Sequence, residues 1–268
     1  MSTPPGTGGL VRRVEHVMGF PVSLAIRGPH ADDDQGRRAW GAVLDWLHHV
    51  DRTFSTYRPD SWISRLGRGE VALADCPPDV CSVLDLAERA RVESGGAFDV
   101  RRPGLDGRMV LDTDGVVKGW ALERAAGLLT ELDDTDFCLS GGGDLTCVTH
   151  AADAPPWRIG IEDPCDPRRV LATVAVHTGS VATSGTAHRG QHLVDARSGT
   201  APASVAQVSV ITASLTWADI DATAAYAHGP DAARWLGARP GRSGLVVWLD
   251  GTTSVTPVLS REREPTVG

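Results

Sequence analysis

The sequence predicts an α+β fold, a single compact domain with a mainly antiparallel sheet and segregated helices. Apolar residues recur at helical spacing through much of the first half of the 268-residue chain, whereas short apolar runs between turn residues dominate the second half. Because the helices are segregated from a mainly antiparallel sheet, this class is preferred to a doubly wound parallel fold. The hydrophobic content of 41% and the charged content of 22% are typical of a globular protein with a full core.

Helical periodicity predicts five helices. Apolar side chains three and four residues apart share one helix face, as do Val43 and Leu47 in the first helix and Ala121 and Ala125 in the third. The second helix is expected to stop where two consecutive glycines follow it. The predicted helices cover residues 33–54, 80–94, 118–132, 218–228 and 231–236.

Strands are predicted where short apolar runs lie between turn residues. Residues 14–27 are expected to form a strand region, because Val22, Leu24 and Ile26 alternate with other residues. Most of the remaining strands fall in the second half of the chain. They are predicted at residues 137–139, 145–149, 157–161, 170–177, 205–212 and 244–249.

The composition limits the location and the partners of the protein. One domain is expected at residues 13–258, between a disordered tail at 1–12 and a flexible tail at 259–268. A net charge of −8 argues against a nucleic-acid binder, and no run of about 18 apolar residues predicts a membrane span. The N-terminal segment lacks an apolar export signal, and the five cysteines form no C-x-x-C motif. We therefore expect a cytoplasmic protein with reduced thiols.

Two oxygen-bearing side chains lie four residues apart on the alanine-rich helix predicted at residues 218–228. Asp219 and Thr223 therefore share one helix face. Such a pair suits Mg²⁺, which takes few protein ligands and completes its shell with phosphate and water. The spacing alone also fits an aspartate that faces the helix dipole and a threonine that bonds back to the backbone.

Three further segments carry candidate chemistry, each with a plain structural alternative. Residues 140–144 read SGGGD, where consecutive glycines either expose amides to a phosphate or form a tight turn. Residues 182–185 read ATSG and are expected at a loop tip, which either caps a ligand or turns the chain. His192 is a candidate general base in a short strand followed by a turn, although most histidines only fill space.

One lysine stands among 26 basic residues, and the other 25 are arginines. This residue, Lys118, directly follows Val117 at the start of the third predicted helix. A compact ammonium at this position either faces a carboxylate or an anionic ligand, or is solvated near the helix N-terminus.

Eight segments, in order, resemble the FAD:protein FMN transferase family, known as ApbE. The resemblance extends from about residue 14 to 250, and its FSTYRPDS and HLVD-x-RSG elements are the specific ones. The matching segments are MGFPV (18–22), FSTYRPDSWISRL (54–66), SGGAFD (94–99), DTDGVVKGWALERA (112–125), SGGGDL (140–145), ATSG (182–185), HLVDARSG (192–199) and ADIDATAAYAHG (218–229).

The resemblance implies an enzyme that takes FAD, moves FMN onto a threonine or serine hydroxyl of an acceptor flavoprotein and releases AMP, with Mg²⁺ as cofactor. It implies that Asp219 and Thr223 bind the metal through side chains and Val117 through its backbone carbonyl. His192 matches the histidine that takes the proton from the acceptor hydroxyl. The FAD contacts that the resemblance implies are Met18, Tyr57, Ala97, Phe98, Asp99, Asp114, Lys118 and Leu193.

Four departures from the family pattern fall near the implied site. Asp114 stands where the family has a small residue, which adds a negative charge near a diphosphate, and Ala196 replaces a proline. Residues 140–144 read SGGGD where the family commonly has NAGGD, and the segment between 185 and 192 is shorter than usual. Two alternatives therefore stand beside the transferase: an FAD diphosphatase that yields FMN and AMP, and a non-catalytic flavin-binding protein.

Overall fold

The computed structural model describes residues 9–103, 109–151, 153–185 and 193–256 and confirms the α+β class. In this part of the chain, the main sheet has eight strands in the order β1-β2-β5-β6-β9-β10-β11-β12, and every neighbouring pair is antiparallel. These strands are β1 (Val11–Val17), β2 (Phe20–Arg27), β5 (Asp136–Gly141), β6 (Asp144–Val148), β9 (Gly179–Gly185), β10 (Val205–Thr212), β11 (Ser243–Trp248) and β12 (Thr253–Val255).

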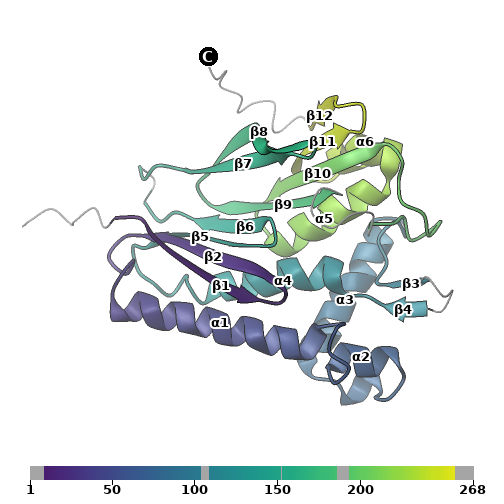
Figure 1. Cartoon of the computed structure of the whole chain (residues 1–268), viewed down its shortest axis with the longest axis horizontal. Coiled ribbons are helices and arrows are strands. Elements are labelled where there is room, and N and C mark those ends of the chain that lie inside the picture. Colours follow the sequence, from purple (N-terminus) through teal and green to yellow (C-terminus); the bar gives the residue numbers. More distant parts are fainter. Residues whose placement is uncertain (1–8, 104–108, 152, 186–192, 257–268) are drawn as a thin grey trace, which may run out of the picture.

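The two faces of the main sheet are covered by different elements (Figure 1). Helices pack on one face and enclose the larger hydrophobic core, while the hairpin of β7 (Trp157–Asp163) and β8 (Asp166–Val176) packs on the other face over a smaller core. A second small hairpin joins β3 (Arg101–Pro103) to β4 (Met109–Leu111). The helices are α1 (Asp34–Phe54), α2 (Trp62–Gly67), α3 (Pro78–Glu93), α4 (Asp114–Gly127), α5 (Leu215–Ala227) and α6 (Ala232–Gly237), with 3₁₀ turns at Leu73–Asp75 and Gly229–Asp231.

The helix predictions are confirmed within a few residues, except at both ends of α4. The predicted helix at 118–132 begins instead at Asp114, after Thr113, and ends at Gly127. Tight backbone turns follow, and they still bury Leu129 and Leu132, which is why the apolar pattern continues past the helix. Among the described residues, no helix is long and apolar enough to span a membrane.

Two strand predictions need correction. The single strand region expected at 14–27 is a hairpin, because Met18 and Gly19 both have positive φ (57° and 80°) and form a two-residue turn between β1 and β2. The loop tip expected at residues 182–185 is part of strand β9, which pairs with β6 on one side and β10 on the other. The sequence pattern did not predict this strand, because its serine and threonine residues leave little alternation of apolar side chains.

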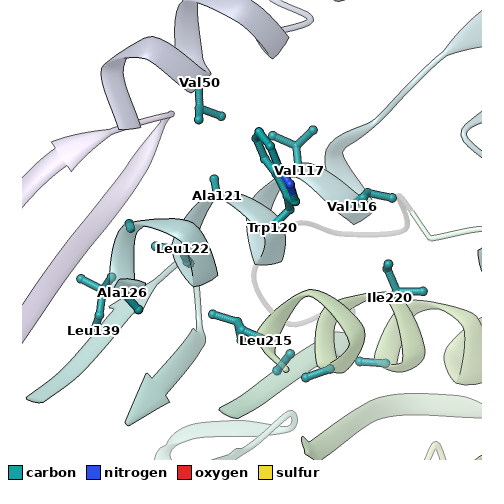
Figure 2. Packing of buried hydrophobic residues seen from close by; sticks show 14 of the residues in the cluster. Val50, Val116, Val117, Trp120, Ala121, Leu122, Ala126, Leu139, Leu215 and Ile220 are labelled. Atoms are coloured by element: carbon teal, nitrogen blue, oxygen red, sulfur yellow. The ribbon is translucent and has the colours of Figure 1, made fainter. Parts of the chain in front are cut away.

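Helix α4 occupies the centre of the larger core, where α1, α5 and the main sheet surround it (Figure 2). Leu122 and Leu139 pack between helix and sheet, and Leu215 and Ile220 of α5 face α4. The closest approach is at Gly119, because an added Cβ there would lie 2.8 Å from both the Asp219 Cβ and the Leu215 carbonyl oxygen. The two helices can therefore be this close only where α4 lacks a side chain.

Gly119→Ala should destabilise the protein by about 1–3 kcal/mol, although alanine favours a helix more than glycine does. Gly127→Ala is the matched control, since an added Cβ at this exposed end of the same helix meets nothing within 4 Å. The control should be neutral or stabilising by up to about 1 kcal/mol. Urea unfolding of both variants measures the difference, and equal effects would show that α4 and α5 do not meet as described.

Candidate functional site

A large cavity, with a volume of about 940 Å³, lies where several elements of the fold end. Cavities of about 300–1,000 Å³ are typical of small-molecule sites. Its wall includes the β1–β2 turn, the first turns of α4, the β5–β6 turn and residues of β7, β9, β10 and α5. Segments far apart in the sequence therefore contribute to one concave site.

A buried ion-pair cluster lies in the wall of this cavity. The Lys118 ammonium lies 2.7 Å from Asp144 Oδ2 and 3.5 Å from Asp219 Oδ1. The Asp144 side chain is fully buried, that of Asp219 is 3% exposed, and that of Lys118 is 16% exposed. Two carboxylates and one ammonium leave a net negative charge in a poorly hydrated place, which favours the binding of a cation.

Asp219 is held by helix α4 as well as by its own helix. Its Oδ2 accepts a hydrogen bond of 2.9 Å from the Gly119 backbone N–H. Burial raises the pKa of Asp219 to about 7; the charge of Asp144 acts in the same direction, while Lys118 and the Gly119 amide oppose it. The surroundings therefore disfavour the ionised form of this carboxyl group, which loses its proton only near neutral pH.

Asp144 lies at the end of a tight hairpin, behind the wall of the cavity. Gly142 and Gly143 both have positive φ (59° and 92°), so the glycine-rich segment is a two-residue turn between β5 and β6, one of the two alternatives from sequence. The Asp144 Oδ1 accepts a 3.0 Å hydrogen bond from the Thr183 backbone N–H of β9. The turn thus fixes one carboxylate beside the cavity.

Hydroxyl groups complete the polar wall. Thr223 lies one helix turn after Asp219 and its Oγ1 is 3.0 Å from the Ser184 Oγ of β9. Among the described residues, no group of three or more His, Cys, Asp or Glu side chains is arranged as a metal site. The Asp219 carboxylate and the Thr223 hydroxyl in the cavity wall still fit Mg²⁺, because this ion takes one or two carboxylates and fills its other positions with phosphate and water.

All eight residues expected to contact FAD line this cavity. Phe98 is buried, its N–H bonds to Ser94 Oγ, and its ring lies so near Gly115 that an added Cβ would be 3.0 Å away. Tyr57 is 92% exposed. The expected residues found in the wall are Met18, Tyr57, Ala97, Phe98, Asp99, Asp114, Lys118, Leu193, Asp219 and Thr223.

Two expected site residues are not found in the wall of this cavity. Val117 does not line the large cavity but an adjoining one of about 70 Å³, and its side chain belongs to the core. His192 lies outside the described residues. The turn that follows it is described: Ala196 N–H donates to the Ala97 carbonyl, and Arg197 pairs with Asp195 at 2.8 Å.

The structure adds wall residues that the sequence did not single out. The apolar part comes from Leu145, Ile159, Ile161 and Val181, and it has no distinguishing sequence signal because core strands show the same residues. Gln207 is 4% exposed and donates a 3.1 Å hydrogen bond to the Glu162 carbonyl, which ties β10 to the β7–β8 hairpin.

The fold and the cavity together define a class: an α+β protein with a sizeable concave site whose wall carries buried charged groups. The chain belongs to the ApbE family, whose family model matches residues 18–106 and 103–246. No curated protein matches the chain in sequence.

Solved structures have the same fold at low sequence identity. The ApbE protein from Thermotoga maritima is 19% identical, with a TM-score of 0.83 over 96% of this chain and 100% of that one. The apo form of the flavinyl transferase ApbE from Pseudomonas stutzeri is 21% identical, with a TM-score of 0.82 over 99% and 100%. The flavin transferase ApbE from Vibrio cholerae is 20% identical, with a TM-score of 0.79 over 95% and 99%.

The buried carboxylate predicts a pH dependence of stability. The folded-state pKa of Asp219, about 7, lies above its ordinary value of 3.8, so the native state holds this proton more tightly between these pH values. Asp219 should therefore contribute a decrease in the free energy of unfolding as pH rises from about 4 to 7, of at most about 1.4 kcal/mol per pH unit. Asp219→Asn should remove this contribution. Urea unfolding in EDTA at pH 5, 6 and 7 measures it, and an unchanged slope contradicts the assignment.

Proposed function

We propose that this protein is a Mg²⁺-dependent FAD:protein FMN transferase, which transfers FMN from FAD to a threonine or serine hydroxyl of an acceptor flavoprotein and releases AMP. Family membership supports flavin transfer in general, and so do two structural neighbours, the flavinyl transferase from Pseudomonas stutzeri and the flavin transferase from Vibrio cholerae. The observation that carries the proposal is the cavity that unites the Asp219–Thr223 pair with all eight expected flavin contacts, Lys118 among them.

The reaction is an attack on a diphosphate. The acceptor oxygen forms a bond to the FMN phosphorus, the bridging bond to the AMP phosphate breaks, and AMP leaves with the bonding electron pair. Catalysis of such a transfer depends mostly on positioning and charge stabilisation. Asp219 and Thr223 would hold Mg²⁺, together with the Val117 carbonyl, and the bound ion would offset the diphosphate charge.

The chain supplies the other parts of the site. Lys118 lies at the cavity wall, where an ammonium can contact a phosphate oxygen. Phe98 and Tyr57 offer aromatic surface for a flat ring. Asp114 begins α4 in the wall of the same cavity, and its negative charge tends to weaken diphosphate binding. We assign the general base to His192, which takes the proton from the acceptor hydroxyl.

The direct test incubates the protein with FAD, Mg²⁺ and a candidate acceptor flavoprotein. Intact-mass spectrometry of the acceptor should show the addition of one FMN, with AMP released in equal amount. Asp219→Ala should abolish both, because the carboxylate that would hold the metal is gone. AMP and FMN without a protein adduct would favour the diphosphatase, and FAD retained without AMP would favour a flavin-binding protein.

His192→Ala should separate catalysis from binding. Removal of a general base typically costs a factor of about 100 or more in rate. We expect such a loss in the transfer rate and less than a threefold change in the Kd for FAD, measured by flavin fluorescence. A parallel loss of transfer and binding would place His192 among the substrate-binding groups instead.

A further inference from the structure

We propose that the glycine-rich β5–β6 turn packs against the side chain of Lys118 and that Asp144 is a positioning residue. Asp144 holds the lysine ammonium where it can contact the diphosphate of the ligand. The inference rests on the proposed function for the identity of the ligand. Asp144 and the turn then act by positioning Lys118, and the turn does not bind the phosphate directly.

The first support is the contact between the turn and the lysine stem. An added Cβ at Gly142 would lie 3.4 Å from Lys118 Cδ and 3.5 Å from Phe20 Cγ. The backbone of the turn therefore borders the aliphatic part of Lys118, and Phe20 of β2 lies beside the same turn. A Cβ at Gly142 would be in van der Waals contact with the lysine stem, and the positive φ of 59° disfavours residues other than glycine there.

The second support is the pairing at the end of the stem. Asp144 Oδ2 lies 2.7 Å from Lys118 Nζ, closer than Asp219 Oδ1 at 3.5 Å. Asp144 cannot turn away easily, because its Oδ1 is held by the Thr183 N–H at 3.0 Å and its side chain is fully buried. The ammonium is therefore held mainly by Asp144, whose carboxylate is fixed in place, and its contact with Asp219 is the longer one.

The third support is that the β5–β6 turn and Lys118 face the cavity. Gly142, Gly143 and Lys118 all line the large cavity, whereas Asp144 does not and stays behind them. The carboxylate behind the ammonium holds it at the cavity wall, where it can contact an anionic ligand. The chain has arginine at 25 of its 26 basic positions, and the one lysine is the residue whose compact ammonium pairs with Asp144 here.

The test uses the fact that the chain has one lysine. Protein labelled with ¹⁵N-lysine has a single side-chain amine nitrogen, so one NMR resonance reports on Lys118 without further assignment. Asp144→Asn keeps the shape and an acceptor for Thr183 but loses the charge. We expect this variant to shift the Lys118 resonance and to raise the Kd for FAD, measured in EDTA, about tenfold.

Asp136→Asn is the matched control on the same hairpin. Asp136 is a buried carboxylate at the start of β5, paired with Arg27 at 2.9 Å, and it does not line the cavity. Its substitution should lower stability but leave the Lys118 resonance and the Kd for FAD unchanged. Circular dichroism confirms that both variants are folded.

A double-variant cycle separates positioning from general disruption. Lys118→Met should raise the Kd for FAD about tenfold, and Asp144→Asn should add less than twofold in that background, because the group it positions is absent. Full additivity would overturn the inference, and so would an unchanged Lys118 resonance in Asp144→Asn. If the wild-type protein does not bind FAD, the proposed function fails, but the resonance still decides whether Asp144 positions Lys118.

Discussion

The contact between helices α4 and α5 determines where the charged groups of the site lie. Gly119 lets α5 approach closely, and the same residue donates its backbone N–H to the Asp219 carboxylate. Lys118, the residue before Gly119 in the same helix, forms ion pairs with both buried carboxylates, those of Asp144 and Asp219. A side chain at Gly119 would therefore separate the helices and move the acid away from its amide partner.

Burial of the charge cluster lowers the stability of the protein in the absence of a ligand. Removing two carboxylates from water costs several kcal/mol each, and a single ammonium offsets only part of this cost. Burial accordingly raises the pKa of Asp219, which shows that its ionised form is poorly stabilised by the protein alone. A cation bound in the cavity would offset this cost. Binding of the cation would therefore raise the free energy of unfolding.

The sheet brings the remaining walls to the same place. Because β2 pairs with β5 so that Val22 lies opposite Gly141, the turn at Met18 and the turn at Gly142 lie at the same end of the sheet. Strand β9 pairs with β6 and adds Thr183 and its neighbours beside the second turn. The β7–β8 hairpin closes the site from the opposite face, where the second core holds it.

The sequence by itself determined the fold class, most helices, the family and a large part of the cavity wall. Local periodicity and residue types contain this information, as the Asp219–Thr223 spacing on one helix face illustrates. Only the tertiary structure decided that Lys118 faces Asp144, that Gly119 is a contact point and that residues 182–185 form a strand. These facts depend on pairs of residues that are distant in the chain, and no local pattern specifies which distant partner a side chain will meet.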